Sequence, residues 1–137
     1  MSAPTKDELA AFLAREFPQT KCTIEALSDG GATVRHEVGP DELRPGGTVS
    51  GPVLMAVADV ALYVAILARI GIVPLAVTTS LNVNFLRKPR AGAAVVGTCR
   101  LLKTGKSLAV GEVTLFSEGD EAPVAHAVGT YSIPRDR

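Results

Sequence analysis

The composition and charge of the chain limit what it can be. Its 137 residues fit one domain, and 47% of them are hydrophobic, which is enough for a buried core. Lys plus Arg equals Asp plus Glu at 14 each, so the chain lacks the basic excess that nucleic-acid binding normally shows. We therefore predict a single domain over residues 1–137, with no nucleic-acid partner.

The cysteines and the first residues indicate the compartment. Cys22 and Cys99 are far apart in the sequence and belong to no Cys/His ligand pattern, so no metal site is predicted. Residues 1–19 are polar and charged, unlike a secretory signal. These features predict a cytoplasmic protein whose two thiols stay free.

The first predicted elements are a short helix and two strands. Thr5 and Glu8 have the spacing of a capping box, which places an N-terminal helix within residues 1–18. Its apolar face consists of Leu9, Phe12, Leu13 and Phe17. Residues 22–28 and 32–38 are predicted to be strands, because an Asp-Gly-Gly turn separates them.

A long central helix is predicted over residues 52–70. The segment is apolar nearly all round, which is typical of a helix buried on every side. Pro52 suits the first turn, and Gly71 follows the last. The apolar run is long enough to span a bilayer, but Asp59 and Arg69 interrupt it. We therefore predict a buried helix and no membrane partner.

The rest of the chain predicts a four-stranded antiparallel segment over residues 77–134. Its strands are expected at 77–85, 94–103, 106–117 and 123–133, with turns at 89–92, 104–105 and 118–120. In the first strand, strict alternation places Val77, Thr79, Leu81, Val83 and Phe85 on one face. Small residues alternate along the last two strands, which lets a helix approach the sheet closely. The element order predicts an α+β fold, with a curved antiparallel sheet around one long helix.

Asp59 is the principal candidate for a catalytic residue. It lies in the middle of the apolar helix with no charged neighbour within one turn, and an ionised aspartate is rarely buried without a partner. Two interpretations stay open: the carboxylate is hydrogen-bonded for structure, or it borders a cavity where it acts as a base. Tyr63, one turn further on, is a candidate substrate-binding residue on the same side of the helix.

The start of the central helix is a second candidate. The Gly51 N–H has no partner within the helix and carries partial positive charge, so it can hold a carbonyl oxygen that gains negative charge. Asp59 follows roughly 12 Å further along the axis, at about 1.5 Å per residue. The alternative is an ordinary N-cap by Ser50.

Two groups of basic residues are candidates for binding phosphate. Arg87 and Lys88 follow the alternating strand, and Gly105 with Lys106 occupies a predicted hairpin. A solvated turn explains each group, and so does contact with a phosphorylated ligand. A phosphate loop is rejected, because Arg100 stands where its first glycine would be.

Residues 44–134 resemble the hotdog-fold acyl-CoA thioesterases, and among them the phenylacetate-degradation thioesterase branch. The motif of that branch is His-Gly-Gly, six residues and then Asp; here Ser50-Gly51-Pro52 precedes Asp59 at the same spacing. The segments 79–86 and 127–131 also resemble the branch. The resemblance implies a hotdog fold that hydrolyses an acyl-CoA thioester to free acid and CoA. It also implies a homodimer, usually paired into a homotetramer, with active sites at the dimer interface and no cofactor beyond the CoA of the substrate.

The resemblance further implies a role for individual residues. Gly51 would polarise the thioester carbonyl, and Asp59 would activate water as a general base or attack as a nucleophile. Thr79 would help to place the water, and Ser50, at the position of the motif histidine, is a further candidate catalytic residue. The residues expected where the CoA phosphates pass are Arg87, Lys88 and Lys106.

The chain departs from the branch motif at the start of the helix. Ser50 replaces the histidine, Pro52 replaces the second glycine, and residues 44–47 replace an Asn or Gln that often lines the site. The altered motif favours an alternative, a non-catalytic hotdog module that binds acyl-CoA as a sensor or partner. A hotdog hydratase or dehydratase ranks last, because that chemistry pairs a histidine with the carboxylate and none lies at the helix start.

Overall fold

The protein is described here by a computed structural model that covers residues 3–134. Two α-helices, one short 3-10 helix and six strands follow one another along the chain. Their bounds are α1 Lys6–Glu16, β1 Cys22–Ser28, β2 Gly31–His36, η1 Pro40–Glu42, α2 Gly51–Ile70, β3 Val77–Phe85, β4 Val95–Thr104, β5 Leu108–Ser117 and β6 Ala125–Ser132. Helix α2 and the six strands lie within one or two residues of their predicted bounds, the N-terminal helix is shorter than predicted, and η1 was not predicted.

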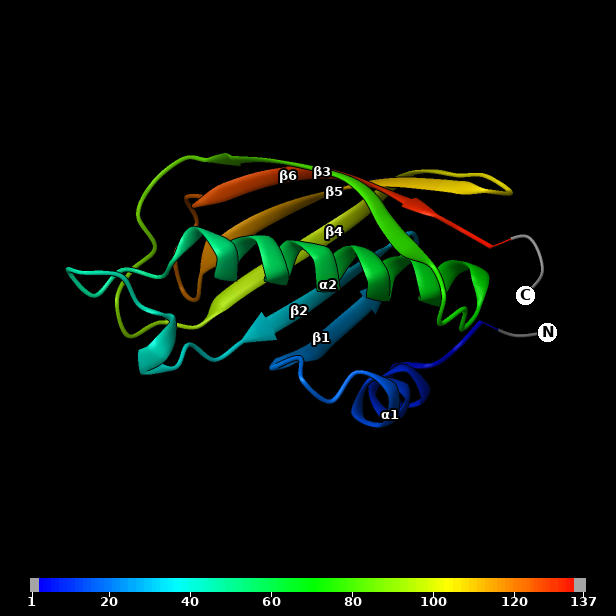
Figure 1. The fold of residues 1–137 in the computed structure, drawn as a ribbon, viewed down its shortest axis with the longest axis horizontal. Coiled ribbons are helices and arrows are strands. Elements are labelled where there is room, and N and C mark those ends of the chain that lie inside the picture. Colours follow the sequence, from blue (N-terminus) through cyan, green and yellow to red (C-terminus); the bar gives the residue numbers. More distant parts are fainter. Residues whose placement is uncertain (1–2, 135–137) are drawn as a thin grey trace.

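All six strands form one antiparallel sheet in the order β1-β2-β4-β5-β6-β3. The sheet curves around α2, which crosses its inner face, and α1 packs beside β1 (Figure 1). This arrangement is the hotdog fold, so the predicted α+β class and its central helix are confirmed.

The pairing of β3 differs from the simplest expectation. Turn signals at 89–92 favour a hairpin between β3 and β4, but β3 pairs with β6 and lies at the edge of the sheet. A turn signal marks where a chain reverses and does not specify the partner strand. The partner is decided by which apolar face matches the helix and the neighbouring strand.

Helix α2 lies close to the sheet because glycines on β5 and β6 make room for it. Gly111 and Gly129 are register partners, and the side chain of Leu62 occupies the space beside both. A Cβ built on Gly111 would lie 2.9 Å from Leu62 Cδ2. On β4, a Cβ on Gly97 would lie 3.2 Å from Val57 Cγ1. The predicted close packing of helix and sheet is therefore confirmed.

Helix α2 is also long and apolar enough to cross a membrane by length and composition alone. However, 61% of its most apolar window is buried inside the protein, as expected for a core helix. The predicted capping box of α1 is present, with Thr5 and Glu8 bonded to one another's backbone N–H groups. Cys22 and Cys99 are both free thiols, as predicted.

Candidate active site

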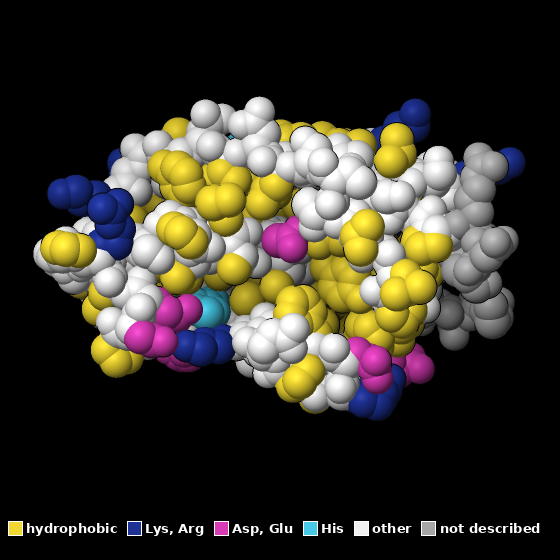
Figure 2. Space-filling view, viewed as in Figure 1, with side chains coloured by type: hydrophobic (Ala, Val, Ile, Leu, Met, Phe, Trp, Pro, Cys, Tyr) yellow, Lys and Arg dark blue, Asp and Glu magenta, His cyan; other side chains and the backbone are white. Residues whose placement is uncertain are grey.

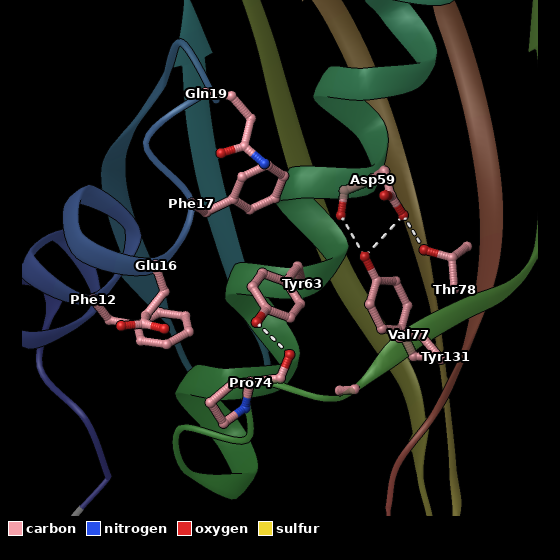
Figure 3. A pocket seen from close by; sticks show the side chains of 11 residues that line it. Phe12, Glu16, Phe17, Gln19, Asp59, Tyr63, Pro74, Val77, Thr78 and Tyr131 are labelled. Atoms are coloured by element: carbon pink, nitrogen blue, oxygen red, sulfur yellow. Dashed lines mark hydrogen bonds between the residues drawn. The ribbon is translucent and has the colours of Figure 1, made fainter.

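The carboxylate of Asp59 lies at the middle of α2 and borders a cavity of about 430 Å³ (Figure 3). Two hydroxyl groups donate hydrogen bonds to its Oδ1 atom: Thr78 Oγ1 at 2.6 Å and the Tyr131 phenol at 2.8 Å. The phenol also lies 3.1 Å from the Asp59 backbone oxygen. Asp59 is half-buried, so its carboxylate is held by neighbours and still faces an open space.

The walls of this cavity are largely aromatic and apolar, and they come from distant parts of the sequence. Phe12 and Phe17 approach from α1 and its C-terminal end, and Tyr63 approaches from α2 (Figure 3). Phe17 meets the Tyr63 ring edge-on, with ring centroids 6.4 Å apart. The polar side chains of Glu16 and Gln19 also line the cavity. The predicted placement of Tyr63 beside Asp59 is therefore present in the structure.

The hydroxyl of Tyr63 is already engaged. It donates a hydrogen bond to the Pro74 carbonyl at 3.1 Å, in the turn between α2 and β3. Burial, together with the nearby Glu16 carboxylate, raises the pKa of the Tyr63 phenol. Tyr63 therefore contributes an aromatic wall and holds the turn before β3 in place.

Gly51 lines a different cavity, of about 650 Å³, at the N-terminal end of α2. Arg44, Arg87 and Lys88 line the same cavity, so the predicted basic cluster lies beside the predicted carbonyl-binding N–H. The ring of Phe85 lies beside Gly51, and a Cβ on this glycine would be 3.4 Å from Phe85 Cζ, an ordinary contact distance. In a single chain, the base and the N–H group thus belong to two cavities that share no lining residue.

The N-terminus of α2 is left without a side-chain cap. Ser50 occupies the N-cap position, but its hydroxyl makes no capping hydrogen bond within the described residues. The described part of the chain also offers no acceptor to the Gly51 N–H. The alternative in which Ser50 caps the helix is therefore not realised, and the N–H group is free to meet a ligand.

Glu42 fixes the loop that leads into this helix, and no pattern in the sequence singles it out. Its carboxylate accepts a hydrogen bond from the Gly39 N–H at 2.8 Å and pairs with His36 Nε2 at 2.9 Å. Its carbonyl accepts the Ser50 N–H at 3.1 Å. Burial opposes ionisation of Glu42, but the carboxylate bonds to Gly39 and His36, with the charge of Lys21, outweigh it and lower its pKa.

The two histidines do not belong to the Asp59 site. His36 is buried against Glu42, and His126 lies 3.6 Å from a Glu112 carboxylate oxygen on the neighbouring strand. Residues 3–134 also contain no cluster of three or more His, Cys, Asp or Glu side chains that could hold a metal ion.

Gly105 and Lys106 lie far from the other predicted phosphate contacts. The Gly105 N–H donates to the Leu108 carbonyl at 2.8 Å and closes the β4–β5 hairpin. Leu108 pairs with Ser132 of β6, and Ser132 pairs in turn with Val77, where β3 begins. Arg87 follows the opposite end of β3. One chain therefore does not bring Lys106 to the cavity of Arg87 and Lys88.

A β-bulge exchanges the roles of two neighbouring threonines. Simple alternation places Thr79 on the helix-facing side of β3, but the register shifts between Thr78 and Ser80. As a result Thr78 faces Asp59, and Thr79 Oγ1 donates to the Thr130 carbonyl at 3.3 Å. Alternation alone does not reveal such a bulge, so it does not predict Thr78 as a site residue.

The pattern of β6 predicts that Tyr131 faces the helix, but only as a packing residue. A buried tyrosine hydroxyl normally finds a hydrogen-bond partner, and this rule is the signal available in the sequence. The only acidic residue in the apolar helix is Asp59. Together, the two observations indicate the hydrogen-bonded pair of Tyr131 and Asp59 that the structure contains.

The fold and this carboxylate site define a class of protein, and comparison with known families identifies it. Residues 46–124, more than half of the chain, match the model of the thioesterase superfamily. The chain therefore belongs to the thioesterase superfamily. No curated protein sequence matches it significantly.

Solved structures agree with this assignment. A candidate thioesterase from Silicibacter sp. TM1040 is 52% identical, with 94% of this chain and 91% of that chain aligned and a TM-score of 0.87. A mutant of the phenylacetic acid degradation protein PaaI from Thermus thermophilus is 29% identical over 90% of this chain and 99% of that chain, with a TM-score of 0.72. Zebrafish thioesterase superfamily member 2, at 20% identity, covers 96% of this chain and 100% of its own, and shares the fold with a TM-score of 0.83.

Proposed function

We propose that the protein hydrolyses an acyl-CoA thioester to the free acid and CoA. One observation carries the proposal: a carboxylate in the middle of an apolar helix, held by two hydroxyl groups, borders an open cavity lined mainly by aromatic and apolar residues. A structural aspartate would need no such cavity. The resemblance to acyl-CoA thioesterases and the membership of the thioesterase superfamily supply the reaction class.

In this proposal Asp59 acts as a general base on water. Its carboxylate takes a proton from the water, and the water oxygen bonds to the thioester carbonyl carbon. The carbonyl oxygen gains negative charge, which the Gly51 N–H stabilises at the electropositive end of α2. The C–S bond then breaks, the acid is released, and the CoA thiolate takes up the proton that Asp59 removed from the water, which restores the carboxylate.

Direct attack by Asp59 is the second route. A carboxylate oxygen bonds to the carbonyl carbon, the C–S bond breaks, and CoA leaves as a thiolate that is then protonated. Water afterwards cleaves the resulting acyl-aspartyl anhydride. Rapid quenching followed by mass spectrometry separates the routes, because only this one adds an acyl group to the protein.

The two cavities suit the two parts of the proposed substrate. The aromatic cavity beside Asp59 would take an apolar acyl group. The cavity of Gly51 would take the CoA end, because Arg87 and Lys88 provide positive charge for its phosphates. Gly105 and Lys106, at the far end of the same sheet, would reach only a CoA bound by a neighbouring subunit.

We further propose that the chain forms a dimer through β3 and the outward side of α2, and that two dimers pair into a tetramer. β3 is an edge strand, and its exposed backbone groups favour pairing with another strand. Val77 and Phe85 are 56% and 54% exposed on this strand, and Met55 is 40% exposed on α2. Figure 2 shows hydrophobic and uncharged atoms over most of the middle of this face, with one acidic side chain near its centre and the other charges toward its rim. Thr79 lies on the exposed strand, where a partner would approach, and its role in placing water is proposed for that assembly.

A panel of acyl-CoAs with detection of the released thiol tests the proposed activity. We expect turnover of at least one acyl-CoA, and we expect Asp59→Asn to abolish it while circular dichroism and thermal unfolding remain those of a folded protein. Asp29→Asn, an exposed aspartate in the β1–β2 turn, is the matched control and should keep full activity. Undiminished turnover in Asp59→Asn would remove this residue from the mechanism.

The separate cavities of Gly51 and Asp59 favour one alternative, a hotdog module that binds acyl-CoA without cleaving it. The replacement of the motif histidine by Ser50 favours the same alternative. Calorimetry on the same panel distinguishes the two functions. Tight binding of an acyl-CoA without thiol release from any member would support the binding module and reject the hydrolase.

A further inference from the structure

Two hydroxyl groups approach Asp59 side by side because of how β3 pairs with β6. Thr78 and Tyr131 are register partners, and the side chains of such partners lie on the same face of a sheet. The bulge at Thr79 turns Thr78 toward the helix and so brings the two hydroxyls together. Both donate to the same carboxylate oxygen, Oδ1 of Asp59.

The Tyr131 phenol is built into the core as a hydrogen-bond donor. The residue is 3% exposed, and its ring stacks on Tyr63 with centroids 6.0 Å apart and an interplanar angle of 29°. Burial and then the charge of Asp59 raise the pKa of this phenol well above its ordinary value. The phenol therefore stays protonated at neutral pH and continues to donate to the carboxylate.

The second carboxylate oxygen is in a different situation. Within the described residues, Oδ2 accepts no hydrogen bond from the protein. The rotation of an aspartate carboxylate about its last bond is otherwise soft, so two donors on one oxygen fix the plane of the group. The geometry directs one oxygen to the sheet and leaves the other available to the cavity.

We infer that Tyr131, together with Thr78, is a positioning residue that orients the Asp59 carboxylate so that Oδ2 is the oxygen that acts on the substrate or its water. This inference rests on the proposed thioesterase function, and it applies to both routes described above. In the general-base route Oδ2 takes the proton, and in the nucleophilic route Oδ2 forms the bond to carbon.

Tyr131→Phe tests the inference, because it keeps the ring and removes only the hydroxyl. We expect kcat to fall about 10- to 100-fold, as is typical when the support of a reacting group is lost, with KM little changed. We also expect the acid limb of the kcat/KM profile to move to higher pH, because hydrogen bonds to a carboxylate favour its charged form. A residue that serves packing alone would leave this limb in place.

Tyr63→Phe is the matched control for the pH profile. It removes a hydroxyl from the adjoining ring of the same aromatic stack, but that hydroxyl bonds to Pro74 and not to Asp59. Its acid limb should therefore stay where it is in the unmodified protein. Equal shifts in both variants, or no shift in Tyr131→Phe, would overturn the inference.

A second measurement serves if Tyr131→Phe does not fold. The chain has two tyrosines and no tryptophan, so in the Tyr63→Phe background the ultraviolet titration of phenolate reports on Tyr131 alone. Adding Asp59→Asn should lower the pH at which Tyr131 ionises, with circular dichroism followed in parallel. If Tyr131 ionised at the same pH with and without the Asp59 carboxylate, the result would contradict a direct contact between the two groups. Turnover by the unmodified protein tests the hydrolase function separately, so failure of the inference and failure of that function give different results.

Discussion

Leu62 of α2 fills the space beside Gly129 of β6, where a Cβ atom would collide with it. The contact sets the separation between the central helix and the sheet, and Tyr131 lies two residues further along the same face. The distance between the carboxylate of Asp59 and its two hydroxyl donors therefore depends on packing at a neighbouring position of the same strand.

Gly129→Ala should accordingly destabilise the protein. Overpacking a filled core typically costs about 1–3 kcal/mol, because the backbone or a neighbouring side chain must move. Chemical denaturation measures the free energy of unfolding. Val128→Ala, on the outer face of the same strand, is the control and should cost less than about 0.5 kcal/mol. Equal effects of both substitutions would show that Leu62 adapts freely.

Thr78→Val and Thr79→Val should affect catalysis differently. Thr78 donates to Asp59, so its loss should lower kcat and move the acid limb of kcat/KM to higher pH. Thr79 is proposed to act on water in the dimer, so its loss should lower kcat and leave that limb unmoved. Thr78→Ser keeps the hydroxyl, so the acid limb of its kcat/KM profile should lie at the same pH as in the unmodified protein. A shifted limb in Thr79→Val would reverse the assignment of the two threonines.

Lys88→Gln should raise KM for an acyl-CoA about 2- to 5-fold with little change in kcat, the range expected for one exposed charge contact. The reason is that Lys88 lines the cavity proposed for the CoA phosphates. Salt should weaken binding to the unmodified protein more than to the variant. Lys103→Gln, an exposed lysine on β4, should leave KM and its salt dependence unchanged. A salt-independent KM in the unmodified protein would argue against phosphate contacts at this cavity.

The stability of the protein should decrease in acid through Glu42. Its pKa in the folded protein is below the ordinary value of 4.5. The folded state therefore binds a proton less readily than the unfolded chain, so the stabilisation is complete above pH 4.5 and is lost as the pH falls through the lower, folded value. Glu42→Gln should lower the free energy of unfolding at neutral pH and flatten its dependence on pH in this acid range. The control is Asp41→Asn, at the exposed residue next to Glu42, which should leave the pH dependence of the free energy of unfolding unchanged.

Much of the architecture was predictable because it follows from local pattern. The capping box at Thr5 and Glu8, the apolar run of α2 and the alternation along the later strands each depend on neighbours within a few residues. The isolation of Asp59 in an apolar helix is also visible in the sequence, since an unpaired charge there needs a partner or a cavity.

Other features depend on contacts between residues far apart in the chain, so they are fixed only when the chain folds. The bulge at Thr79 selects Thr78 as the partner of Asp59, because the shift arises from pairing with β6 and not from the composition of β3. The partnership of Tyr131 with Asp59 joins residues 72 positions apart. The position of β3 at the sheet edge likewise follows from strand order, and so does the distance of Lys106 from Arg87, because these two residues lie toward opposite ends of the sheet. Local propensity does not encode this order.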